Sequence, residues 1–385
     1  MHLNQTQTNE ELVDNVTSSL QDSSSTPSLS LPGHIRWVST AIIAVVLVAG
    51  VVGNLLVPVV VLRGKRSTPV YFMTNLAIAH LLVLVICVPT VLVELQSTPE
   101  AWVLGPFLCK ARPFVEYTAV HGSAASLLVV SLERYVVVCR PLHASSSMTR
   151  HTCVTALLIC WGAALLSSSP ILWIQYSSDA LFLDGVRRPV CLTDLQPLWA
   201  RLYFVVVAVV FFFVPLLLLV ALYGNMAAKL LQDTSHLGIT GPNPHLRTRR
   251  QLVLMLALVV FFFFLCLLPL RIFLLWILAS PQEDILALGM EGYYTLLYFC
   301  RVMFYLNSAL NPVLYNVTSR RFRVAFVTIC CVRTDRRPLQ SDFFTSFTKR
   351  EVECPQNRLP LKECGSLENK DKNIARKFKL DHSSS

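Results

Sequence analysis

The chain has 385 residues, of which 54% are hydrophobic and 15% are charged, and its formal net charge is +10. Ordinary soluble domains carry about 25% charged residues, so this composition excludes a typical soluble enzyme, and the high hydrophobicity excludes a disordered chain. The positive charges flank apolar segments and form no single basic face, which favours a membrane protein over one that binds nucleic acid.

Residues 1–36 are polar and contain no apolar core of a cleavable signal peptide, so the first apolar segment is expected to direct membrane insertion. Seven apolar segments follow, each long enough to cross a hydrocarbon core of about 30 Å as a helix. They cover residues 37–62, 70–93, 113–132, 152–174, 202–228, 251–280 and 285–317. The predicted fold is an all-α membrane protein, a seven-transmembrane helix bundle over residues 37–318.

Lysine and arginine are concentrated in alternate connections between these segments. The basic connections are residues 63–66, 140–150, 229–250 and 320–323. Arg187 and Arg188 are exceptions, in a longer connection that also holds three aspartates. Since basic residues favour the cytoplasmic side, we expect a multi-pass plasma-membrane protein with its N-terminus outside the cell and its C-terminus in the cytoplasm.

Three features suggest modification. Asn4 and Asn15 begin Asn-X-Thr sequons on the predicted extracellular tail and are candidates for glycosylation. Cys109 and Cys191 are the two cysteines predicted on the oxidising side, where a bridge would fix the long connection to the bundle; two free thiols are the alternative. The cysteine pair ending residues 319–331, an expected amphipathic eighth helix, is a palmitoylation candidate or an unmodified pair. This pair is Cys330 and Cys331.

Five ionisable residues lie well inside the predicted spans, where each costs several kcal/mol and is therefore a functional candidate. They are His80, Glu116, His121, Arg271 and Arg301. All but His80 belong to the predicted outer halves of spans, where, with Tyr117, they are expected to line a cavity open to the outside. The alternative is an ion pair between Glu116 and either arginine that only holds helices together. No metal-ligand cluster, phosphate-binding loop or nucleophile triad is seen in the sequence, so neither a cofactor nor an enzymatic activity is expected.

Two further motifs lie at the predicted cytoplasmic ends of spans. The third span ends in Glu133-Arg134-Tyr135, where a carboxylate next to the arginine can hold its guanidinium in one state and release it in another. The seventh ends in Asn311-Pro312 followed by Tyr315, where the proline frees a backbone carbonyl.

In combination these motifs resemble the rhodopsin-like (class A) G-protein-coupled receptors over roughly residues 37–331. Other landmarks that carry the resemblance are Gly53-Asn54, Asn75-Leu76-Ala77, Trp161, Pro215, Tyr223, Cys266 and Pro269. The resemblance implies that Arg134, Tyr223 and Tyr315 rearrange on activation to admit a heterotrimeric G protein. It also makes receptor kinases and arrestin candidate partners of the polar tail at residues 332–385, with membrane lipid around the bundle.

The ends of the fifth and seventh spans resemble the thyrotropin-releasing hormone receptors more closely. The matching segments are Leu222-Tyr223-Gly224, Phe299-Cys300-Arg301 and Tyr305 through Pro312. This resemblance implies a short amidated peptide ligand, contacts from Tyr117 and Arg301, and coupling to the phospholipase C and calcium branch.

Several positions depart from that family. His121 replaces an asparagine, Leu270 a tyrosine and Glu116 a glutamine, which suggests a different small peptide, one with a basic group for Glu116. His80 replaces the aspartate that, with a span-three serine, holds a sodium ion, so no allosteric sodium effect is expected even though Ser123 and Asn307 remain. Leu267 stands where most relatives carry a tryptophan.

The alternatives are a receptor of the ghrelin, motilin and neuromedin group, a constitutively active receptor, or a receptor fold that no longer signals. A more remote alternative is a proton-coupled transporter, although no internal repeat is seen.

Overall fold

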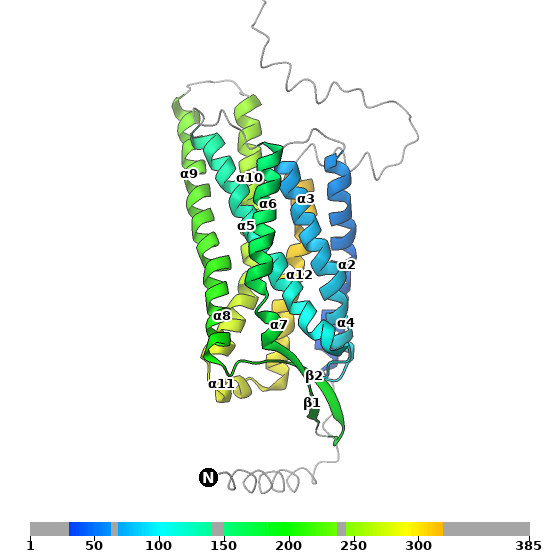
Figure 1. Ribbon diagram of the computed structural model, residues 1–385. Coiled ribbons are helices and arrows are strands. Elements are labelled where there is room, and N and C mark those ends of the chain that lie inside the picture. The colour runs from blue at the N-terminus through cyan, green and yellow to red at the C-terminus, as the bar shows by residue number, and fades with distance from the viewer. Residues whose placement is uncertain (1–30, 63–67, 141–148, 183, 237–243, 319–385) are drawn as a thin grey trace, which may run out of the picture. The chain divides into compact units, whose positions relative to one another are not determined.

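The computed structural model describes residues 31–62, 68–140, 149–182, 184–236 and 244–318. These residues form a bundle of long helices with one β-hairpin at one end (Figure 1). The all-α membrane class is confirmed.

The helices follow the predicted order. They are α2 (Gly33–Leu62), α3 (Thr68–Leu82) with α4 (Val88–Gln96), α5 (Gly105–Cys139), α6 (Arg150–Ser168) with α7 (Ile171–Ile174), α8 (Leu198–Ala208) with α9 (Val214–His236), α10 (Pro244–Ala279), α11 (Gln282–Ala287) and α12 (Gly289–Thr318). The helix α12 packs against both α2 and α10, and α5 contacts α3, α6 and α9.

Two segments of the bundle contain a π-helical turn, η1 (Val83–Cys87) between α3 and α4 and η3 (Val209–Phe213) between α8 and α9. Each is followed two residues later by a proline, Pro89 or Pro215. A proline ring clashes with the carbonyl four residues earlier in a regular α-helix, and in both cases that carbonyl lies inside the π turn. The wider turn therefore lets the helix continue past the proline.

Within the described residues, six helical segments are long and apolar enough to span a membrane, and α12 is not among them. The helix α12 carries a charged Arg301 and the buried amides of Asn307 and Asn311, which face the bundle. Polar groups on the inward face of a membrane helix are compatible with spanning because neighbouring helices satisfy them.

The observed bounds differ from the predicted segments in two instructive places. The third segment extends at both ends beyond its apolar part, to Gly105 and Cys139, because polar side chains do not prevent the backbone from remaining helical. The last predicted segment, residues 285–317, is divided into α11 and α12. Gly289 has φ +65°, a left-handed conformation that ends a helix and that glycine adopts without strain.

The antiparallel hairpin of β1 (Gln175–Leu181) and β2 (Arg187–Thr193) was not predicted as strands. In the turn between them, Arg188 donates to Asp184 over 2.5 Å and lowers the pKa of that carboxyl. Trp102 N–H donates to the carbonyl of Pro189 over 2.7 Å, which attaches the loop before α5 to the hairpin.

Buried polar side chains connect the helices in the middle of the bundle. Asn54 on α2 donates to the carbonyl of Ser308 on α12 over 2.7 Å. Trp161 on α6 donates to Asn75 on α3 over 2.6 Å. Gly53 permits the close approach of α12, because a Cβ there would lie 2.8 Å from the ring of Pro312. These class A landmarks therefore act as helix-to-helix contacts.

The hairpin end of the bundle is the end that holds β1, β2, α11 and the start of α5, and the Arg134 end is the opposite one (Figure 1).

Candidate functional site

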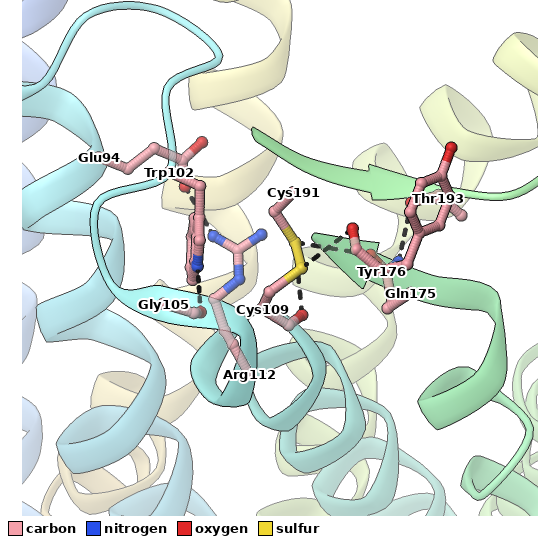
Figure 2. Close-up of a disulfide and its surroundings, with 9 residues drawn as sticks. All are labelled: Glu94, Trp102, Gly105, Cys109, Arg112, Gln175, Tyr176, Cys191 and Thr193. Carbon is pink, nitrogen blue, oxygen red and sulfur yellow. Dashed lines mark hydrogen bonds and ion pairs between the residues drawn. A yellow bond between two sulfur atoms is a disulfide. The ribbon is translucent and has the colours of Figure 1, made fainter. Parts of the chain in front are cut away.

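A disulfide joins Cys109 on the first turns of α5 to Cys191 on β2, with 5.6 Å between the Cα atoms (Figure 2). The predicted bridge is confirmed. It fixes the middle of β2, and with it the hairpin, to the helix that carries Glu116 and Tyr117. Gln175 of β1 donates to Thr193 of β2 over 2.8 Å and closes the base of the hairpin next to the bridge.

One carboxylate and two guanidinium groups from three different helices meet beside this bridge. Glu94 on α4 accepts from Arg112 Nη1 over 2.6 Å and from Arg301 Nη1 over 2.8 Å. Arg112 lies on α5 and Arg301 on α12, and Figure 2 shows the guanidinium of Arg112 between Glu94 and the disulfide. We call these three residues the Glu94 cluster.

The Glu94 cluster is partly accessible to solvent. The side chains of Glu94, Arg112 and Arg301 retain 20%, 16% and 15% of their exposure. Each guanidinium also lies over an aromatic ring, Arg112 at 5.2 Å from Trp102 and Arg301 at 5.5 Å from Tyr298. These rings hold the arginines in place while leaving part of each guanidinium open to a ligand.

Glu94 and Arg112 were not among the residues predicted from the sequence. The predicted spans end at residue 93 and begin at residue 113, so each group was excluded by a single position. The chemical signal was present, since both are charged residues next to an apolar segment, and a helix frequently continues past its apolar part.

The alternative interpretation, an ion pair of Glu116 with Arg271 or Arg301, is wrong for the described residues. Glu116 accepts a hydrogen bond of 2.6 Å from the phenol of Tyr305 on α12, and Arg301 pairs with Glu94. The reason is geometric. On α12, Tyr305 lies one helical turn beyond Arg301 and therefore at the level of Glu116 on α5. Arg301 lies at the level of Arg112, one turn earlier on α5.

Arg271 on α10 contributes a third arginine to the same end of the bundle. Its guanidinium lies 4.9 Å from the centre of the Tyr117 ring, and 7% of the residue is exposed. Tyr117 also contacts the ring of Phe204 on α8 edge to face, at 6.0 Å. Tyr117 thereby links α5 to α8 and α10, and the structure brings it together with Arg271 as the sequence analysis expected.

His121 lies deeper and is fully buried. Its Nδ1 is 3.0 Å from the hydroxyl of Ser167 on α6, and its ring stacks on Phe211 of η3 at 4.0 Å. Its Nε2 has no hydrogen-bond partner among the described residues. The structure therefore places His121 below Tyr117 as a buried group with one free nitrogen.

The remaining predicted ligand and switch positions on α10 pack into the core. Leu270 is half-buried against the main hydrophobic cluster, and Leu267 retains 1% of its exposure inside it. Position 267 therefore holds a buried aliphatic side chain where most relatives in the resemblance carry a tryptophan.

At the Arg134 end, Arg134 forms an ion pair with the neighbouring Glu133, with Nη2 2.9 Å from Oε2. The hydroxyl groups of Tyr223 on α9 and Ser131 on α5 lie 2.9 Å apart. Tyr135 is half-buried against Met226 and its neighbours on α9.

His80 occupies the centre of the bundle, with 4% exposure. Its Nε2 is 2.5 Å from the amide nitrogen of Asn311, and its Nδ1 is 3.1 Å from the hydroxyl of Ser308. An amide nitrogen can only donate, so Nε2 accepts and the imidazole is neutral with its proton on Nδ1. Ser123 and Asn307 line a small cavity next to it. His80 therefore joins α3 to the segment of α12 that ends in Pro312 and the buried Tyr315.

The remaining predicted sites lie outside the described residues. They are Asn4, Asn15, Cys330, Cys331 and the expected eighth helix at residues 319–331. Within the residues that the structure describes, no group of His, Cys, Asp and Glu is arranged to hold a metal ion.

Comparisons with known proteins agree with this architecture. The model of the 7 transmembrane receptor (rhodopsin family) matches residues 53–315. The human growth hormone secretagogue receptor type 1 is 32% identical over 292 residues, which covers 74% of this chain and 78% of the relative. A QRFP-like peptide receptor from Branchiostoma floridae is 28% identical, over 87% of this chain and 88% of the relative. The mouse galanin receptor type 2 is 29% identical, over 82% and 84%.

Proposed function

The chain belongs to the rhodopsin family of seven-transmembrane receptors, and from this premise we propose that it is a plasma-membrane receptor for a small peptide. The observation that carries the proposal is the convergence of three arginines and two glutamates from four helices beside the disulfide. Charged groups that are partly accessible to solvent at one end of a helix bundle are suited to bind the polar backbone and termini of a peptide.

We place the hairpin end outside the cell. The distribution of Lys and Arg in the connections supports this orientation, because the helix ends next to the basic connections lie at the Arg134 end. The disulfide at the hairpin end also supports it, since disulfides persist in oxidising surroundings. The exceptional Arg188 in the hairpin is paired with Asp184, which offsets its charge.

Two ligand classes are supported by different observations. The span-seven motif around Arg301 resembles the thyrotropin-releasing hormone receptors and favours a short amidated peptide. The identity to a receptor named for growth hormone secretagogues favours the ghrelin, motilin and neuromedin group as the second candidate. The relatives named for a QRFP-like peptide and for galanin add these two peptides to those that should be tested.

Ligand binding at the hairpin end is proposed to shift an existing equilibrium toward a state that binds a heterotrimeric G protein at the Arg134 end. Arg134 forms an ion pair with Glu133 in the structure, and we propose that this pair opens in the state that binds the G protein. We propose the phospholipase C branch, with receptor kinases and arrestin acting on residues 332–385.

The direct experiment is to measure intracellular calcium in cells that express the chain. The peptide panel contains thyrotropin-releasing hormone, growth hormone secretagogues, a QRFP-like peptide and galanin. A calcium response to one peptide that is lost with Arg134→Ala supports the proposal. Surface expression is measured in parallel by an N-terminal tag. Absence of any response or basal signal at normal surface expression, in calcium and cyclic AMP assays alike, would contradict it.

A further inference from the structure

We propose that Arg112 and Arg301 form a carboxylate-binding subsite that Glu94 fills in the unliganded receptor, and that the ligand carries a carboxylate which takes the place of Glu94. The carboxylate belongs to an acidic side chain or to a free C-terminus of the peptide. This inference rests on the proposed function and names the chemical class of ligand group that the Glu94 cluster selects.

The hydrogen bonding of the two guanidinium groups supports a shared carboxylate site. Each guanidinium has five N–H donors in a planar fork that matches a carboxylate. Only Nη1 of each arginine donates to Glu94. Nε of Arg112 is buried and has no partner among the described residues. The site therefore has donor capacity beyond what the single Glu94 carboxylate uses.

The charge balance of the hairpin end also supports a carboxylate-binding subsite. The cluster consists of two positive groups and one negative group, and Arg271 adds a third positive group nearby. The other carboxylate, Glu116, accepts a hydrogen bond from the neutral phenol of Tyr305 and keeps its charge, so three positive groups stand against two negative ones. The described groups of this site thus have an excess of positive charge that a ligand carboxylate would neutralise.

The position of Glu94 makes it replaceable. It lies in the last turn of α4, where a negative charge opposes the helix dipole, so its place is stabilised by the arginines and not by its own helix. Its side chain is 20% exposed, so a ligand approaching from the hairpin end can reach the two guanidiniums. The rings of Trp102 and Tyr298 keep the arginines in position when the carboxylate is exchanged.

Exchange of the carboxylate also offers a route from ligand to helix movement. Glu94 ties α4 to α5 and α12 at once. A ligand carboxylate at the same arginines keeps α5 and α12 joined but releases α4. The class of ligand group and the movement that it permits are therefore consequences of the same three side chains.

The first test is chemical rescue of Glu94→Ala in the purified full-length receptor. Removing Glu94 leaves two arginines facing an empty carboxylate position. We expect sodium acetate, compared with sodium chloride at equal ionic strength, to raise the melting temperature of Glu94→Ala and to have no such effect on the natural chain. Glu116→Ala is the matched control, because its partner is a tyrosine and acetate has no arginine pair to bind there. An equal acetate effect on all three proteins would overturn the proposal.

The second test uses the natural chain and so does not depend on a variant that folds. Immobilised receptor is exposed to two libraries of random hexapeptides. One library has free C-termini and contains Asp and Glu, and the other has carboxamide termini with Asn and Gln in their place. We expect retained peptides to come from the carboxylate library with about tenfold or greater preference, and Arg112→Gln to abolish the preference. Equal retention from both libraries, including none from either, would overturn the subsite.

The outcomes separate the two proposals. A calcium response to a peptide without carboxylate preference or acetate rescue would leave the receptor function standing and remove the subsite. Acetate rescue together with the carboxylate preference, but without any cellular response, would support the subsite and contradict the signalling function.

Discussion

The two ends of the bundle use arginine in different ways. At the hairpin end, Arg112 and Arg301 reach from separate helices to one carboxylate on a third helix. At the Arg134 end, the guanidinium of Arg134 pairs with the adjacent residue of the same helix. The first arrangement ties helices together, so a ligand that disturbs it changes how helices are held. The second ties no helices together, so it can open without loss of a helix contact.

The largest effect is expected from Arg301→Ala. The substitution leaves Glu94 with Arg112 alone and removes the guanidinium from the ring of Tyr298. In the proposed subsite Arg301 also binds the ligand carboxylate. Truncating one partner of such a charge pair across an interface costs several kcal/mol, so the peptide concentration for half-maximal calcium response should rise about a hundredfold or more. Arg201→Ala is the matched control, because Arg201 is an exposed arginine on α8. Similar responses in the two variants would show that the hairpin end is not the binding site.

A smaller loss is expected from Glu116→Gln. The amide oxygen still accepts the hydrogen bond from Tyr305, so the change removes the charge and keeps the contact. Affinity for a peptide with a basic group should fall about tenfold, since a charged hydrogen bond becomes a neutral one. Competition binding with a peptide pair that differs by Lys and Gln measures this effect. If Glu116→Gln leaves the affinity of every cationic peptide unchanged, Glu116 does not bind a basic group of the ligand.

Sodium tests the region between the two ends. In the natural chain the neutral ring of His80 provides nitrogen where a hard cation needs oxygen donors, so agonist affinity should not respond specifically to sodium. His80→Asp places a carboxylate beside Ser123 and Asn307, and sodium should then lower agonist affinity by about fivefold. Binding in sodium chloride is compared with binding in the chloride of a bulky organic cation. A sodium-specific fall in the natural chain would contradict the role given to His80.

The smallest effect is expected from Glu133→Gln. A neutral amide holds Arg134 less strongly than the carboxylate does, at a loss of a fraction of a kcal/mol. Basal inositol phosphate production without ligand should rise about twofold to threefold at equal surface expression. Arg134→Ala should remove the increase in the double variant. An unchanged basal signal in Glu133→Gln would mean that this ion pair does not restrain the receptor.

The length of the apolar segments was sufficient to predict the helical bundle, and the cysteine positions indicated the disulfide, with two free thiols as the alternative. The centre of the candidate site was only partly predictable. Glu94 and Arg112 lie one residue outside the apolar segments, and a hydropathy boundary does not show where a helix ends. The alternative interpretation of the sequence paired Glu116 with an arginine. Its partner is Tyr305, because the positions of α5 and α12 along the bundle bring these two residues to the same level, which is a property of packing.

The burial of His121 could not have been predicted either. Its one-turn spacing from Tyr117 correctly placed both on one face of α5. The stacking partner, Phe211, lies in a π-helical turn, where the side-chain directions differ from those of a regular α-helix. No simple sequence pattern distinguishes such a turn from a regular α-helical one, although a proline two residues after it is a useful signal.

The π turn η3 also has a consequence for protein engineering. It accommodates one extra residue in a continuous helical segment, because a π turn is closed by hydrogen bonds between residues five apart and an α turn by residues four apart. Deletion of a single residue between Val209 and Phe213 should therefore return this segment to a regular α-helix and leave Tyr223 facing Ser131. The same deletion within α9 itself would rotate the residues that follow it by about 100° around the helix axis. A chimaera that joins the first half of this helix to the second half of a relative must therefore preserve the helical phase, and the residue count changes by one where the relative lacks the π turn.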